Sequence, residues 1–181
     1  AKTAVSHLEF EALHPFQDGN GRIGRMLITL MLWQAKAISA PHFYISGYFE
    51  EHKERYTELM RQVSQTGNWN EWCQFFFEAI YWQAGHNLKI AQNIHALYEE
   101  MKSIFTETLS SKHSLAVLDF VFTYPVFRNS RLAERTNIPP ATANRFTKAL
   151  LEKGILSLKE EASGRKSALY SFEGMMELVR V

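Results

Sequence analysis

The stretch from His14 to Arg25, HPFQDGNGRIGR, brings together the features that anion chemistry requires. Glycines allow backbone conformations that point successive N–H groups in one direction. The N-terminus of a helix adds unpaired N–H donors and a partial positive charge. Because Gly19, Asn20 and Gly21 stand where a helix is predicted to begin, this segment predicts a phosphate-binding nest.

The charged side chains of the same stretch indicate which phosphate compound and which reaction to expect. Arg22 and Arg25 lie three residues apart, reach the same side of a helix and favour a polyphosphate. Asp18 by itself would repel phosphate, so we expect Mg²⁺ between them. His14 is the candidate base, since histidine exchanges protons near neutral pH. The stretch therefore predicts a Mg-nucleotide beside a histidine base.

Simpler interpretations of these residues stay open. His14 and the two arginines are also compatible with solvated surface charges, and Asp18 with a plain N-cap. The glycines from Gly19 to Gly24 run G-x-G-x-x-G, but no strand precedes them and no GKS or GKT follows, which excludes a dinucleotide turn and a P-loop. His7 lies one heptad before His14 without a third ligand nearby, so we interpret it as structural.

Composition limits the classes of protein that the chain can belong to. Its 181 residues, 46% hydrophobic and 13% aromatic, predict one large or two small globular domains. A net charge of +1 provides no general attraction for nucleic acid or membrane. The single Cys73 excludes an internal disulfide and a cysteine-rich metal site, and it fits a reducing, cytoplasmic location. The chain begins at Ala1 inside a predicted helix, so we expect a fragment of a longer protein without a membrane span.

The first part of the chain reads as helices. We expect them over about residues 2–13, 20–38, 47–65 and 69–109, the last as two helices or as one kinked near Gly85. From Met26 to Trp33 the sequence is apolar on nearly every face, which predicts a buried central helix. The aromatic run from Trp69 to Trp82 has helical spacing and predicts core packing.

A polar linker at Ser110–Lys112 separates a second region. Here we expect helices over about 114–123, 129–136 and 140–153, then strands at 155–159 and 168–172. This order is typical of a winged helix, so the predicted fold is mostly α: a helical bundle over 1–109 and a winged-helix domain over 110–181. The polar residues of the predicted recognition helix that could contact DNA are Thr142, Asn144, Arg145 and Lys148.

HPFQDGNGRIGR resembles the Fic family, since it fits the motif H-P-F-x-D/E-G-N-G-R-x-x-R at every fixed position. HLEFEALHPF and residues 44–76 are similar to the family's flanking helices, and the trailing winged helix is similar to that of many bacterial members. The resemblance implies a protein adenylyltransferase, which transfers AMP from Mg-ATP to a Ser, Thr or Tyr hydroxyl of a target protein.

The resemblance also implies roles for individual residues. His14 would deprotonate the target hydroxyl, Asp18 would hold Mg²⁺, and Phe16 would anchor the loop in the core. Where the family has a Tyr-Tyr pair near adenine, this chain has Tyr56-Thr57. The resemblance therefore implies a role near adenine for Tyr56 alone. The residues expected to bind the nucleotide are Gly19, Asn20, Gly21, Arg22, Ile23, Gly24, Arg25 and Tyr56.

Two family elements have no counterpart in the sequence, and two other functions stay open. Thirteen residues before His14 cannot hold the target-docking flap, and the nearest match to the inhibitory S/T-x-x-x-E-G/N segment, Glu173-Gly174, lacks its Ser or Thr. The alternatives are a DNA-binding regulator whose Fic domain senses nucleotide, and removal of AMP by the same site. The target protein and a homodimeric state stay undecided.

Overall fold

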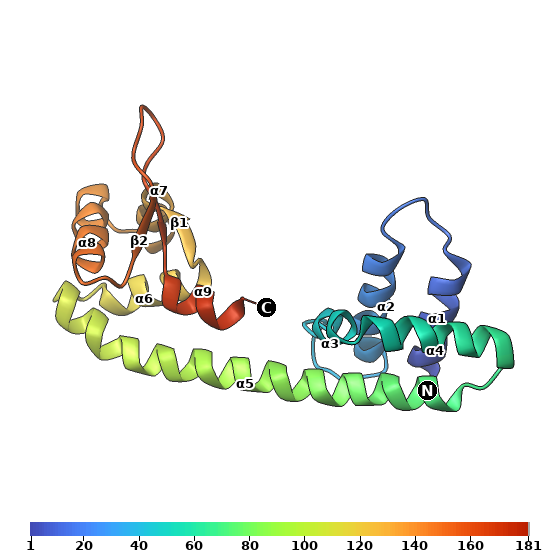
Figure 1. Ribbon diagram of the computed structural model, residues 1–181. Coiled ribbons are helices and arrows are strands. Elements are labelled where there is room, and N and C mark those ends of the chain that lie inside the picture. The colour runs from blue at the N-terminus through green and yellow to red at the C-terminus, as the bar shows by residue number, and fades with distance from the viewer. Residues whose placement is uncertain (181) are drawn as a thin grey trace. The chain divides into compact units, whose positions relative to one another are not determined.

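The computed structural model describes residues 1–180, which are mostly helical (Figure 1). They form two compact units, residues 1–89 and residues 90–180. No helix within the described residues is long and apolar enough to cross a membrane.

The N-terminal unit is built from helices around an aromatic core. Its elements are α1 (Lys2–Leu13), α2 (Asn20–Gln34), α3 (Ser46–Glu51), α4 (Lys53–Thr66) and the first part of α5 (Asn70–Leu109). Trp72, Phe75 and Phe76 of α5 are almost completely buried, as the helical spacing of the aromatic run predicts. The indole N–H of Trp72 donates to the Ala4 carbonyl at 2.9 Å, which fixes α1 against α5. Leu8 of α1 and Ile28 of α2 belong to the same core, so the segment 14–25 connects two helices that this core holds in place.

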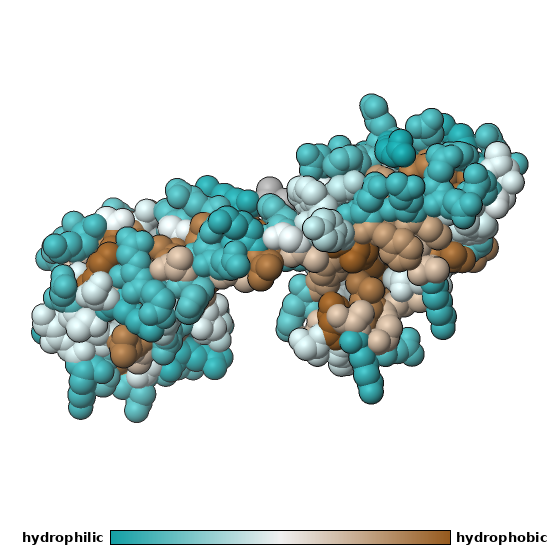
Figure 2. All heavy atoms as spheres, turned by 90° about the horizontal axis from the view of Figure 1, so that it is seen from below, coloured by the Kyte–Doolittle hydropathy of each residue, from teal (hydrophilic) through white to brown (hydrophobic). Residues whose placement is uncertain are grey.

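The expectation that α2 is buried on all sides is wrong. Met26, Leu30 and Trp33 are 63%, 43% and 48% exposed, whereas Asn20, Gly24 and Ile28 are the buried residues of α2. The reason is that α1 packs along one face of α2, and the opposite face borders a pocket. Figure 2 shows hydrophobic residues gathered on one face of the N-terminal unit.

Two other helix predictions for this unit need correction. The helix expected over about 47–65 is two helices, because the backbone at His52 (φ −111°, ψ 32°) leaves the helical conformation between α3 and α4. In contrast, α5 is a single helix of 40 residues that passes through Gly85. A lone glycine costs a helix only about 1 kcal/mol, so flanking helical residues outweigh it.

The C-terminal unit combines helices with a small sheet. Besides the rest of α5 it contains α6 (Ser114–Thr123), β1 (Val126–Arg128), α7 (Asn129–Thr136), α8 (Pro140–Glu152), β2 (Ser157–Glu160), β3 (Leu169–Ser171) and α9 (Glu173–Val179). The strands are antiparallel in the order β1-β3-β2, with Phe127 opposite Tyr170. β1 and α9 were not expected, because three and seven residues are too short to produce a clear periodic pattern.

The division between the units lies inside α5, whereas the predicted domain boundary is at 109/110. Met101, Phe105 and Leu109 of α5 are buried in one cluster with Val117 and the other core residues of the C-terminal unit. The last turns of α5 therefore belong to the second core. The predicted linker begins at Ser110, whose left-handed backbone (φ 44°) separates α5 from α6.

Candidate functional site

His14 occupies an unusual backbone position at the end of α1. It has φ 44° and ψ 56°, and its N–H closes the helix by donating to the Phe10 carbonyl at 3.1 Å. Pro15 disfavours the right-handed helical conformation at the residue before it. Left-handed backbone is uncommon outside glycine and is often found at functional sites. The His14 side chain is exposed and is therefore accessible to a ligand.

The loop between α1 and α2 is held by Asn20, which is 2% exposed. Its side chain accepts a hydrogen bond from the Phe16 N–H at 3.0 Å and donates one to the Phe16 carbonyl at 2.6 Å. The expectation that the Phe16 ring anchors the loop in the core is wrong, because that ring is 50% exposed and lies 6.2 Å from Phe10. A buried amide that pairs with both backbone groups of one residue fixes the loop instead.

The start of α2 presents free backbone donors. Gly19 is the N-cap with φ 84°, which favours glycine. Within residues 1–180, the backbone N–H groups of Asn20, Gly21 and Arg22 have no hydrogen-bond acceptor. Asp18 accepts from the Gly19 N–H at 2.7 Å, so its carboxylate precedes the cap residue and does not itself cap the helix. Unpaired N–H groups in this arrangement can bind an anion.

The two arginines stand beside these donors. Arg22 makes one weak contact, 3.4 Å to Asp18, and both side chains are largely exposed (75% and 93%). Such exposed ion pairs stabilise a protein little, so Arg22 can exchange Asp18 for a ligand at low cost. One guanidinium nitrogen of Arg25 lies 3.2 Å from the position that a Cβ on Gly21 would occupy. Arg25 therefore folds back over the first turn of α2.

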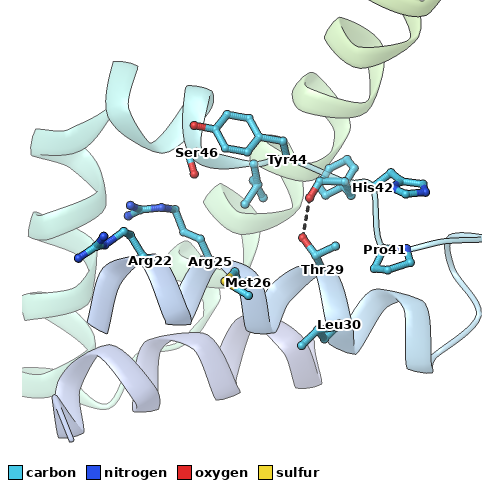
Figure 3. A pocket seen from close by; sticks show the side chains of 11 residues that line it. Arg22, Arg25, Met26, Thr29, Leu30, Pro41, His42, Tyr44 and Ser46 are labelled. Atoms are coloured by element: carbon cyan, nitrogen blue, oxygen red, sulfur yellow. Dashed lines mark hydrogen bonds between the residues drawn. The ribbon is translucent and has the colours of Figure 1, made fainter. Parts of the chain in front are cut away.

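Arg22 and Arg25 line one end of a pocket of about 640 Å³ (Figure 3). Its wall is continued along α2 by Met26, Thr29 and Leu30. The other wall is the segment 41–46, which is held to α2 by a 2.5 Å hydrogen bond from the Thr29 hydroxyl to the Phe43 carbonyl. Sequence reasoning missed these walls. The i, i+3, i+4, i+7 spacing from Arg22 could have indicated the α2 wall, but no sequence signal marks the loop.

The side chain of His7 is buried where α1 packs against Gly24 of α2. His7 is 1% exposed, stacks between Phe49 and Trp72, and shares a 2.9 Å hydrogen bond between its Nε2 and the Tyr56 hydroxyl. Burial lowers the pKa of His7 to about 4, and the nearby Arg25 charge acts in the same direction, while the Gly24 backbone carbonyl opposes it. Neutral at pH 7, His7 connects α1 with α4.

Tyr56 therefore lies with the core and is not among the residues that line the 640 Å³ pocket. Burial raises the pKa of its hydroxyl, and the charge of Glu11 adds to that rise. Its hydroxyl is a neutral partner for His7 at any physiological pH.

The residues of this site could bind Mg²⁺ only together with the phosphate groups of a ligand. No group of three His, Cys, Asp or Glu side chains that could hold a metal occurs among residues 1–180. Asp18 offers one exposed carboxylate next to the free N–H groups. Mg²⁺ is typically bound through one or two carboxylates together with the phosphates of a substrate, which this arrangement allows.

The predicted DNA-contacting residues lie on α8. Asn144, Arg145 and Lys148 are exposed and Thr142 is partly buried, but the Asn144 amide oxygen accepts a hydrogen bond from Asn129. In the β2–β3 region, Glu160 pairs with Arg128 at 2.6 Å and with Lys166 at 2.9 Å. These two hydrogen-bonded cations lower the pKa of Glu160 to about 2. Glu160 therefore neutralises part of the positive charge of Arg128 and Lys166.

Comparisons with known proteins agree with the motif. Residues 1–32 match the model of the Fic/DOC family. The chain is 30% identical over 115 residues to "Probable protein adenylyltransferase aq_aa38" of Aquifex aeolicus (strain VF5). That match covers 54% of this chain and 35% of the relative, so the chain spans about a third of the relative's length. The resemblance of the N-terminal segment to the Fic family is thereby confirmed.

Proposed function

We propose, from the match of residues 1–32 to the Fic/DOC family, that the N-terminal unit binds Mg-ATP and transfers AMP to a Ser, Thr or Tyr hydroxyl of a target protein. The observation that carries this proposal is the placement of two arginines on one pocket wall, beside three unpaired N–H groups at the start of α2. A polyphosphate is the ligand whose charge and number of acceptors match such a set.

The proposed transfer gives each of these groups a role. The N–H groups at Asn20 and Gly21 hold phosphate oxygens, while Arg22 and Arg25 stabilise the charge on the β- and γ-phosphates. His14 takes the proton from the target hydroxyl, whose oxygen forms a new bond to the α-phosphorus. The bond from that phosphorus to the oxygen bridging to the β-phosphate breaks, and pyrophosphate leaves. Mg²⁺, held through Asp18, would neutralise charge on the leaving group.

Calorimetric titration of Mg-ATP into the chain tests the proposal. Replacing Arg25 by alanine removes a charge-assisted contact to phosphate, so binding is expected to weaken about tenfold or more. Arg61→Ala, which removes an exposed arginine of α4, is the matched control and is expected to bind like the parent. Equal affinities of the Arg25→Ala variant and the parent would refute the assignment of the site.

For the C-terminal unit we propose a winged-helix domain. In support, α6, β1, α7, α8, β2 and β3 follow one another in the order typical of that fold, and β2 and β3 form an antiparallel hairpin. The second candidate function, a DNA-binding regulator, is favoured by the exposed Arg145 and Lys148 on α8. Its weakness is the internal pairing of Arg128 and Lys166 with Glu160.

A further inference from the structure

The carboxyl group of Glu11 lies against Gly24, one of the residues expected to bind the nucleotide. Glu11 is on α1, one helical turn after His7, and it packs against α2 at Gly24. A Cβ added to Gly24 would come within 2.1 Å of the Glu11 Oε1 and 3.2 Å of the His7 ring. Because Gly24 has no side chain, the Glu11 carboxyl group can lie directly against the backbone of α2 at this position.

The Glu11 side chain is half-buried, and one of its two carboxyl oxygens is fully buried. The Oε1 atom of Glu11 has no partner among the described residues, and neither does the Nδ1 atom of His7. A buried charge that lacks hydrogen bonds is costly, which favours the protonated carboxylic acid. Burial accordingly raises the pKa of Glu11, while the charges of Arg25 and His14 oppose that rise. Whether the Glu11 carboxyl group is ionised therefore depends on the nearby charges of Arg25 and His14.

Among the described residues, few titratable or charged groups face Glu11. From α1 they are His7, which is neutral because its pKa is about 4, and His14. From α2 the facing charge is Arg25, and from α4 it is the Tyr56 hydroxyl, which is also neutral. Arg25 is thus the permanent charge that stabilises an ionised Glu11. When a triphosphate binds to Arg25, the anion cancels that stabilisation.

We propose that Glu11 is a positioning residue of the nucleotide site, which balances the charge of Arg25 while the site is free and takes up a proton from solvent when a nucleoside triphosphate binds. The inference rests on the proposed function for its ligand. The step adds one proton to the carboxylate and gives a neutral carboxylic acid. Nucleotide binding and protonation of Glu11 then favour each other, as linkage requires.

The first test compares Mg-ATP affinities of the parent chain and Glu11→Gln from pH 5 to pH 8. Glutamine is isosteric with the protonated acid and cannot ionise. The ratio of the parent Kd to the variant Kd is expected to be smaller at pH 5 than at pH 8, where it should reach about fivefold, the order of one charge interaction at a partly screened site. A purely structural Glu11 would give a ratio that does not change with pH, and that result would overturn the proposal.

The second test needs no nucleotide and separates this proposal from the proposed function. Carboxyl ¹³C resonances of a glutamate-labelled chain are followed against pH, and the resonance missing from Glu11→Gln identifies Glu11. Arg25→Gln is expected to move its titration midpoint upward, and an unchanged midpoint would overturn the coupling. If the parent fails to bind Mg-ATP, the proposed function and the ligand of this inference fail together, and the carboxyl titration still decides whether Glu11 balances Arg25.

Discussion

The buried His7 predicts a specific acid sensitivity of the N-terminal unit. In the unfolded chain a histidine takes up a proton near pH 6.5, but burial lowers the pKa of folded His7 to about 4. Between these values the unfolded state binds more protons, so the free energy of unfolding falls as the pH is lowered from 6.5 to 4. The loss amounts to about 2 kcal/mol at pH 5 and about 3 kcal/mol below pH 4.

His7→Gln removes the titrating ring and is expected to remove this loss. Urea unfolding followed by tryptophan fluorescence is the assay, because all four tryptophans lie between residues 33 and 82 and report on the N-terminal unit. Glu11, whose raised pKa acts in the opposite sense, is present in both proteins and cancels in the comparison. His42→Gln, at an exposed histidine, is the control. If parent and His7→Gln lose the same stability between pH 7 and pH 5, the reasoning about His7 is refuted.

Three further substitutions test separate parts of the description. Asn20→Ala removes both bonds to the Phe16 backbone and should destabilise the N-terminal unit by about 1–3 kcal/mol, measured by the same urea titration; an unchanged midpoint would contradict the role of Asn20. Gly24→Ala should push the Glu11 carboxyl group aside and crowd the buried His7 ring, but replacing a helical glycine regains about 1 kcal/mol, so the expected net loss is about 1 kcal/mol in that assay. A midpoint at or above that of the parent would show that the site is roomier than described. If the second unit binds DNA, Arg145→Glu should weaken retention of the full chain on duplex DNA and reduce the salt dependence by about one phosphate contact; retention that is equal for parent and variant would exclude Arg145 from the interface.

Much of the local structure follows from local sequence signals. Pro15 sets the end of α1, and the predicted limits of α6 and α7 agree with the structure. The exposed face of α2 could not be predicted in this way. An apolar residue such as Met26 indicates a preference for burial, but it does not indicate which other element is available to cover it.

The candidate site could be located from the sequence because its proposed anion-binding residues lie in one short contiguous segment. The contacts that support this segment are long-range. The bond between His7 and Tyr56 joins residues 49 positions apart, and the contact of Glu11 with Gly24 depends on how α1 packs against α2. Tyr56 was expected near the nucleotide because of the resemblance to the family's Tyr-Tyr pair, and its hydrogen bond with His7 could be found only from the fold.

These contacts divide the site into a fixed part and an adaptable part. Asn20 and Gly24 are buried, so the first turn of α2 and its free N–H groups are in place before a ligand arrives. Arg22 and Asp18 are exposed and pair only weakly with each other, so the proposed nucleotide would have to order them on binding. Donors that need no rearrangement contribute orientation at little entropic cost, whereas ordering exposed side chains subtracts from the affinity gained. We therefore expect substitutions of Asn20 or Gly24 to affect the orientation of the bound phosphates, and substitutions of Arg22 to affect mainly the affinity for the nucleotide.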